Sequence, residues 1–90
     1  MKKYKVDYTN AARKIINKLD DQIKTRIKNW INNYLEGCEN PRFQGKALTG
    51  KFAGKWRYRV GNYRIIAEIQ DDKIVILIVD VDKRNDIYKN

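Results

Sequence analysis

The stretch from residue 55 to residue 70 constrains the fold most, because apolar residues alternate with arginines before a single tight turn and a second apolar-rich segment follows it. Gly61 and Asn62 are residue types that favour the two-residue turn of a β-hairpin. The alternation before the turn has the period of two that marks a strand with one buried face, and the segment after the turn follows as the second strand. The sequence therefore predicts an antiparallel hairpin of two strands.

The turn also fixes which side chains share a face of this hairpin. With two residues in the turn, Arg59 lies opposite Arg64 and Arg57 lies opposite Ile66, and opposed side chains project from the same side of a sheet. The other side carries apolar and aromatic residues, namely Trp56, Tyr58, Val60, Tyr63 and Ile65. We therefore expect three arginines on one face and a core-forming surface on the other.

Apolar residues at helical spacing predict two helices upstream of the hairpin. The first runs from residue 10 to about 18 behind the N-cap Thr9, and the second runs from residue 22 to 36 and ends at Gly37. Because only about two residues join the two predicted helices, the helices should form an antiparallel hairpin. Each helix has one apolar stripe to bury, and the apolar face of the strands is suited to receive it.

Two further strands are expected. Residues 3–8 alternate as a short strand, and the nearly continuous apolar run at 73–81 predicts a central strand that is covered on both faces. A turn at Asp71-Asp72 would place Val79 opposite Arg64.

Together these elements predict one α+β domain over residues 1–90. Its antiparallel sheet, made of the short N-terminal strand and a three-strand meander, packs on the two-helix hairpin. A chain of this length buries a single core. Apolar runs are too short to span a bilayer, and the N-terminus lacks the apolar segment of a secretory signal. We therefore expect a soluble cytoplasmic protein without a membrane partner.

The domain is strongly basic, with 20 lysines and arginines against 11 acidic residues and a formal net charge of +9. Seven cations and no acidic residue lie between residues 42 and 64, namely Arg42, Lys46, Lys51, Lys55, Arg57, Arg59 and Arg64. A basic surface with interleaved aromatic residues suits RNA, so Lys46, Lys51 and Arg42 are predicted to bind it. The simpler interpretation is solvated charge that protects a strand edge from aggregation. The convergence of three arginines on one face favours a binding site.

The missing residue types exclude several kinds of active site. The chain has no histidine, no serine and one cysteine, which removes Ser-His-Asp and Cys-His nucleophiles, zinc sites built on His and Cys, and an intramolecular disulfide. Asp80, Asp82 and Asp86 come closest to a group of carboxylates that could hold a metal, but Asp82 and Asp86 are better suited to ion pairs with Lys83 and Arg84. We expect neither a metal nor a cofactor.

RNA cleavage needs neither histidine nor a bound metal, because the 2′-hydroxyl of the substrate is an internal nucleophile. The protein must align the attack and stabilise the negative charge of a pentacovalent phosphorane. Arginine is suited to that task but not to general-base work, since its pKa lies above about 12. A lysine among other cations can lose its proton more easily.

Three motifs resemble the RelE/ParE family of toxins from bacterial toxin-antitoxin systems. They are Lys46-Ala47-Leu48-Thr49-Gly50, the segment WRYRVGNYRII that begins at Trp56, and residues 82–88 with the sequence DKRNDIY. Their order and spacing, with the elements upstream, extend the resemblance over essentially the whole chain. The resemblance implies the RelE-like toxin fold. For the RelE branch it also implies a ribosome-dependent, metal-independent mRNA endonuclease, or mRNA interferase, that inhibits translation.

The resemblance also implies roles for individual residues. Arg57 and Arg59 match positions that act on the scissile phosphate and the nucleophile, and Arg64 matches the arginine that stabilises the transition state. Arg84 matches a residue that helps the leaving group, and Tyr88 matches the tyrosine that stacks on or orients a nucleotide.

The chain departs from the RelE pattern at two places. Arg57 and Arg59 stand where studied RelE nucleases carry a lysine pair, and Lys83 stands where many relatives carry a histidine. We therefore expect Lys55 or Lys83 to be the substitute general base.

The resemblance implies an acidic cognate antitoxin that covers the basic surface, forms a hetero-oligomer with the toxin and contacts operator DNA. Apolar residues on the arginine-bearing side would be exposed unless the C-terminal tail or a partner covers them, namely Ile66, Val75, Leu77 and Val79. Two alternatives remain open. One is a gyrase poison of the ParE branch, and the other is a catalytically weakened toxin that is retained as an antitoxin-binding module.

Overall fold

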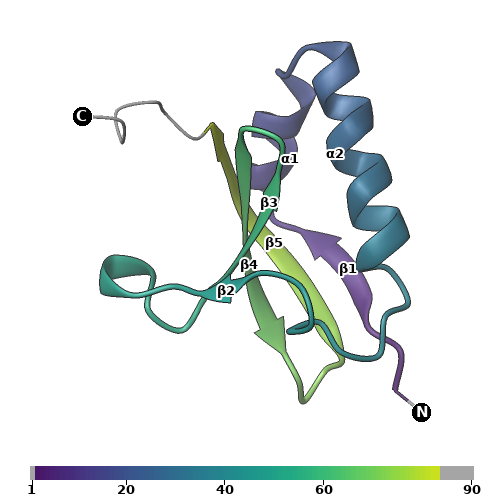
Figure 1. Ribbon diagram of the computed structural model, residues 1–90, viewed down its shortest axis with the longest axis vertical. Helices are drawn as coiled ribbons and strands as arrows, with labels where there is room; N and C mark the ends of the chain where they lie inside the picture. Colours follow the sequence, from purple (N-terminus) through teal and green to yellow (C-terminus); the bar gives the residue numbers. More distant parts are fainter. Residues whose placement is uncertain (1, 84–90) are drawn as a thin grey trace.

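The computed structural model describes residues 2–83, which form a five-stranded sheet with two helices packed on it (Figure 1). In chain order the elements are β1 (Lys5–Tyr8), α1 (Asn10–Asn17), α2 (Asp21–Tyr34), β2 (Lys46–Ala47), the 3-10 helix η1 (Gly50–Phe52), β3 (Trp56–Val60), β4 (Tyr63–Gln70) and β5 (Val75–Lys83). The predicted α+β class is confirmed. None of the helices in the described part of the chain has the length and apolarity needed to cross a membrane.

Both helices form where the apolar spacing predicts them. Thr9 is the N-cap of α1, and its Oγ1 accepts a hydrogen bond from the N–H of Ala12 at 3.1 Å. The second helix ends at Tyr34, two residues earlier than expected, and Gly37 adopts a positive φ of 79°. The N–H of Gly37 then donates to the carbonyl of Tyr4 at 2.8 Å, which ties the end of the helical layer to the start of β1.

The sheet has the order β1-β5-β4-β3-β2 and is mixed rather than antiparallel. Strand β1 pairs in parallel with β5, from Lys5 opposite Val75 to Tyr8 opposite Ile78. The intervening helices and strands supply the crossover that a parallel pair requires. The two-residue strand β2 was too short to predict. The central strand is β4, whereas β5 buries alternate residues, so the expected double coverage of β5 was wrong.

The β3–β4 hairpin has the predicted register, with Val60 opposite Tyr63, Arg59 opposite Arg64 and Arg57 opposite Ile66. The fixed geometry of its two-residue turn explains this agreement.

The register between β4 and β5 differs from the prediction. Four residues rather than two join these strands, and a bulge leaves Val79 without a partner in β4, because Ala67 pairs with Ile78 and Ile66 pairs with Asp80. Arg64 therefore lies opposite Asp82 and not opposite Val79. A bulge shifts the side chains that follow it relative to the neighbouring strand, so a register counted from the turn alone fails here.

The core lies between the helices and the apolar face of the sheet. Its buried residues come from the helices and from strands β3, β4 and β5, together with Tyr4 and with Leu35, the residue that follows α2: Tyr4, Ala12, Ile16, Ile27, Ile31, Leu35, Tyr58, Val60, Ile65, Ala67, Ile76, Ile78 and Val81. Tyr58 is fully buried, and its hydroxyl donates to the carbonyl of Pro41 at 2.6 Å. Burial raises the pKa of Tyr58, so the phenol remains a neutral donor.

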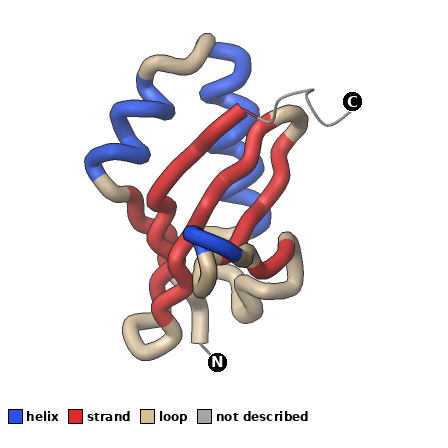
Figure 2. The backbone as a smooth tube through the Cα atoms, turned by 90° about the vertical axis from the view of Figure 1, so that its left-hand side faces the viewer, coloured by secondary structure: helices blue, strands red, loops and turns tan. Residues whose placement is uncertain are grey.

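The opposite face of the sheet is partly covered as well. The 3-10 helix η1 lies on the side of the sheet away from α2 (Figures 1 and 2). Ile66, which was expected to be exposed unless the C-terminal tail or a partner covers it, is fully buried although it does not belong to the helix-side core. Val75, Leu77 and Val79 are half-buried.

Candidate nucleic-acid interface

Four cations share the side of the sheet that faces away from the helices, and we call this surface the arginine face. Arg57 and Arg59 project from β3, Arg64 projects from β4 opposite Arg59, and Lys46 of β2 lies opposite Arg57. Arg59 and Lys46 are exposed, whereas Arg57 and Arg64 are half-buried. The strands thus collect residues that are up to 18 positions apart in sequence.

Lys46 reaches this surface because Gly45 allows the chain to approach β3 closely. Gly45 has a φ of 83°, and a Cβ atom there would lie 2.2 Å from the carbonyl oxygen of Arg57. Trp56 completes the contact, since its Nε1–H donates to the carbonyl of Gln44 at 2.6 Å. A residue with a side chain at position 45 would push Lys46 away from Arg57.

Arg64 is held by a bidentate ion pair within the sheet. Its Nε donates to Oδ1 of Asp82 at 3.0 Å, and its Nη2 donates to Oδ2 at 2.8 Å. The side chains of Arg64 and Asp82 are 25% and 36% exposed, so solvent screens the pair less than it would an ion pair on the open surface. The sequence predicted ion pairs of this carboxylate with Lys83 and Arg84, whereas the structure pairs Asp82 with Arg64.

Two predicted residues lie near the arginine face. Lys55 directly precedes β3 and is half-buried, and strand alternation puts it on the same side as Arg57. Lys51 lies in η1, on the side of the sheet away from α2 (Figure 2), and its Nζ is 5.6 Å from the ring centroid of Phe52.

The structure separates two other predicted residues from this surface. Lys83 pairs opposite Tyr63 and lines a small pocket on the helix side with Arg26 of α2. Arg42 lies beside the β4–β5 turn, where its Nη1 and Nη2 donate to the two carboxylate oxygens of Asp71 at 3.2 and 2.9 Å. Arg84 and Tyr88 lie outside the described residues.

Asp71, in the β4–β5 turn, binds both the segment between α2 and β3, through Arg42, and the N-terminal segment, through Tyr4. It accepts a hydrogen bond from the Tyr4 hydroxyl at 2.7 Å. The guanidinium of Arg42, followed by the Tyr4 hydroxyl, lowers the pKa of the Asp71 carboxyl below its ordinary value. Arg64 lies six positions along β4 from Gln70 at this end of the sheet, about 20 Å at the usual rise, so Arg42 is not part of the arginine face.

Sequence reasoning missed an open groove of about 580 Å³ between α2 and the end of β3. Arg59 lines it from the strand, and Arg26, Trp30 and Tyr34 line it from the helix. The ring centroids of Trp30 and Tyr34 are 5.2 Å apart, and Tyr34 is 50% exposed. The signal in the sequence was the pair of aromatic residues at i and i+4, which the helical pattern assigned entirely to the core.

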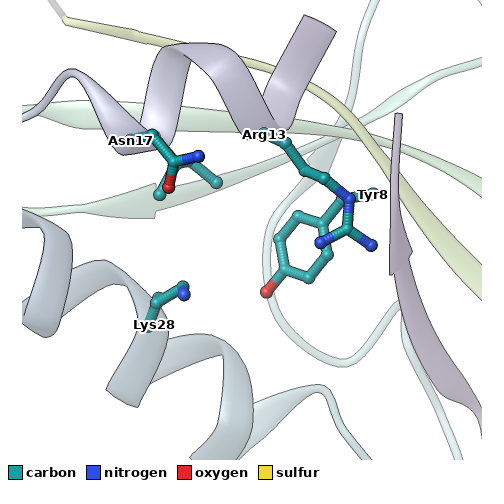
Figure 3. Close-up of a pocket in the computed structure, with 5 residues that line it drawn as sticks. Tyr8, Arg13, Asn17 and Lys28 are labelled. Atoms are coloured by element: carbon teal, nitrogen blue, oxygen red, sulfur yellow. The ribbon is translucent and has the colours of Figure 1, made fainter. Parts of the chain in front are cut away.

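A third pocket, of about 80 Å³, lies on the helix side next to β1, the strand at the opposite edge of the sheet. Figure 3 shows Tyr8, Arg13, Asn17 and Lys28 around it. The guanidinium of Arg13 lies 5.4 Å from the ring centroid of Tyr8 and 3.8 Å from Asp7. Burial raises the pKa of Tyr8 despite the nearby cation. This pocket is separate from the arginine face.

The arginine face has the chemistry of a phosphate-binding surface. Guanidinium groups remain protonated at physiological pH and pair with phosphate oxygens through planar forks of N–H donors. The adjoining groove offers exposed aromatic surface on which a base could stack. Within residues 2–83, no cluster of acidic, histidine or cysteine side chains has the composition of a metal site.

Comparison with known families and sequences gives one consistent result. Residues 6–88 match the family described as ParE toxin of the type II toxin-antitoxin system parDE. The chain is 33% identical over 86 residues to the toxin RelG of Mycobacterium tuberculosis, covering 96% of this chain and 97% of that protein. It is 28% identical over 82 residues to the mRNA interferase toxin RelE of Escherichia coli, covering 90% of this chain and 83% of that protein.

Solved structures agree with the fold. The Mycobacterium tuberculosis toxin-antitoxin complex RelBE2 contains a chain that superposes with a TM-score of 0.81 and 30% identity, over 91% of this chain and 99% of that one. The isolated Escherichia coli RelE toxin superposes with a TM-score of 0.73 over 96% of this chain and 92% of that one. Its identity is 24%, so this second likeness concerns the fold alone.

Proposed function

We propose that this chain, which belongs to the RelE/ParE family of type II toxin-antitoxin toxins, is a ribosome-dependent endonuclease that cleaves mRNA and thereby inhibits translation. The observation that carries this proposal is the arginine face, where Arg57, Arg59 and Arg64 converge beside Lys46. The name of the Escherichia coli relative, an mRNA interferase toxin, supports it.

In the proposed reaction the 2′-hydroxyl of the substrate attacks the adjacent phosphorus atom, and the 5′-oxygen of the next nucleotide leaves. Arg57 and Arg59 bind the scissile phosphate, and Arg64 stabilises the charge that develops on its oxygens. A nucleophile within the substrate makes alignment the main task of the protein.

Lys55 is the better placed of the two candidate bases. It directly precedes β3, on the side of the sheet that carries Arg57, whereas Lys83 lines a pocket on the helix side. We assign proton removal from the 2′-hydroxyl to Lys55. Arg84 would help the leaving oxygen and Tyr88 would orient a nucleotide, as the family resemblance implies.

We further propose an acidic antitoxin as the resting partner of the toxin in the cytoplasm. The arginine face offers charge-assisted, bidentate pairing to aspartate and glutamate, so a partner that covers it would exclude RNA. The toxin-antitoxin assembly of the Mycobacterium tuberculosis relative supports such a complex. Contact with operator DNA would then be made by the antitoxin.

A second function is favoured by one observation, the match of residues 6–88 to the ParE family description. A toxin of that branch poisons DNA gyrase and leaves mRNA intact. The two functions predict different damage in the same cells, so a single experiment separates them.

The test is induction of the toxin without its antitoxin, followed by primer extension on an abundant translated mRNA. We expect cuts at fixed positions within codons, absent from an Arg59→Ala, Arg64→Ala double variant. A Lys14→Ala, Lys18→Ala variant is the control, since it removes two exposed charges from the α1 segment and should cleave like the unmodified chain.

Growth arrest with intact mRNA would contradict the nuclease assignment. Trapped gyrase-DNA complexes in that culture would identify the gyrase poison. No effect on growth would identify a weakened toxin whose remaining role is to bind its antitoxin.

A further inference from the structure

The carboxylate of Asp82 accepts two hydrogen bonds from one edge of the Arg64 guanidinium. Nε and Nη2 of Arg64 donate to the two oxygens of Asp82 at 3.0 and 2.8 Å, the parallel arrangement of a bidentate pair. We propose that Asp82 is a positioning residue, which orients Arg64 so that its guanidinium stabilises the phosphate in the transition state. This inference rests on the proposed nuclease function.

The geometry supports orientation more than simple charge balance. A bidentate pair fixes both the plane and the direction of the guanidinium, whereas an arginine side chain without such a pair samples many rotamers. Both side chains are half-buried, so solvent competes with the pair less than it would at the open surface. Because electrostatic stabilisation depends on donors that are already aimed at the developing charge, a fixed orientation should raise the rate of the chemical step.

The β-bulge in β5 brings Asp82 to this position. If the register near the turn continued unchanged, Val81 would lie opposite Arg64 and Asp82 would project toward the helices. The bulge at Val79 advances the register by one residue and puts Asp82 on the arginine face. Thr9 contacts the bulge, since its N–H donates to the carbonyl of Ile78 at 3.0 Å and its hydroxyl donates to that of Val79 at 3.5 Å.

A positioning role has a kinetic signature that a merely structural role lacks. Loss of the Asp82 charge makes the surface more positive, so RNA binding should stay equal or become tighter. Loss of the pairing leaves Arg64 less well aimed, so the cleavage step should become slower. The affinity for RNA and the rate of cleavage should therefore change independently. Partial unfolding would reduce the amount of active protein and would lower the apparent affinity and the apparent rate together.

The chain offers a matched control in Asp71, which forms the same kind of bidentate pair with Arg42 at the far end of the sheet. Asp82→Asn and Asp71→Asn change the net charge equally, and each removes the carboxylate from one Arg–Asp pair. Asp82→Ala serves as a second variant, and thermal melting establishes which variants are folded.

The first measurement is the ¹H-¹⁵N spectrum of arginine Nε–H groups in the purified toxin, with Arg64 assigned through Arg64→Lys. We expect a distinct, slowly exchanging Arg64 signal that shifts and exchanges faster in Asp82→Asn and Asp82→Ala, and that is unchanged in Asp71→Asn. An Arg64 signal that does not respond to Asp82→Asn overturns the inference, whether or not the toxin cleaves RNA.

The second measurement is single-turnover cleavage of mRNA on programmed ribosomes. We expect Asp82→Asn to slow cleavage by about ten-fold to a hundred-fold without weakening mRNA binding, and Asp71→Asn to cleave normally. In an Arg64→Lys background the effect of Asp82→Asn should disappear, because it acts through Arg64. Cleavage that is equally fast or faster in Asp82→Asn overturns the inference. If the unmodified toxin cleaves no mRNA, the proposed function fails and the spectrum alone decides whether Asp82 orients Arg64.

Discussion

At the residue scale, the absence of a side chain at Gly45 lets Lys46 join the arginine face. A Cβ at position 45 would meet the carbonyl of Arg57 at 2.2 Å and the Nε1 of Trp56 at 2.8 Å. This Cβ would therefore clash with strand backbone on one side and with a hydrogen-bonded indole on the other. Gly45 therefore sets the distance between Lys46 and the arginines of β3.

We expect Gly45→Ala to lower the free energy of unfolding by about 2 kcal/mol or more, measured by urea denaturation, because left-handed backbone strain and a steric clash combine. Gly54→Ala is the matched control. Gly54 has a similar φ of 90°, with no atom within 4 Å of an added Cβ, so this variant should show only the strain, about 1 to 2 kcal/mol. Equal losses in both variants would contradict a close approach at Gly45.

At the element scale, turns of different kinds decided which strand registers the sequence could reveal. The two-residue turn at Gly61-Asn62 allows one register, so the opposition of Arg59 and Arg64 followed from the sequence alone. The β4–β5 register depends on a four-residue turn and on the bulge at Val79, and the bulge contacts Thr9, which is distant in sequence.

The candidate site was predictable to the same extent. The grouping of the three arginines rests on the hairpin and was expected, whereas their arrangement beside Asp82 depends on the bulge and was not. Strand β1 and the two-residue strand β2 carried no sign of their partners, since pairing between remote segments is decided by packing. The position of Arg42 beside Asp71 was hidden for the same reason.

Thr9 joins two elements, because its hydroxyl both caps α1 and contacts the bulge of β5. We expect Thr9→Ala to lower the free energy of unfolding by about 1 to 2 kcal/mol, since it removes the cap acceptor and the donor to Val79. Thr9→Ser keeps the hydroxyl and should stay within about 0.5 kcal/mol of the unmodified chain. Urea denaturation of both variants measures the difference, and similar losses for alanine and serine would argue against the role of the hydroxyl.

At the scale of the whole molecule, the net charge of +9 attracts RNA in general, whereas the arginine face would bind it at one surface. Removing a charge from that face or from another part of the molecule distinguishes these two kinds of binding. If RNA lies along the arginine face, each phosphate contact contributes about 0.7 to the slope of log affinity against log salt for a single strand. We expect Arg59→Gln to reduce that slope by about 0.7 and Lys14→Gln on α1 to leave it nearly unchanged.

Fluorescence anisotropy with a short single-stranded RNA, at several salt concentrations, measures both slopes. Equal reductions in the two variants would mean that RNA is attracted by the overall charge rather than by the arginine face.

The parallel pairing of β1 with β5 has a consequence for the order of events during synthesis. Strand β1 is among the first segments made, yet its partner residues 75–78 follow about 70 positions later. Until then the apolar stripes of α1 and α2 have no complete sheet to cover, because β3, β4 and β5 all come from the second half of the chain. A nascent toxin on the ribosome thus exposes its future core for most of its synthesis and closes its sheet only when β5 has emerged.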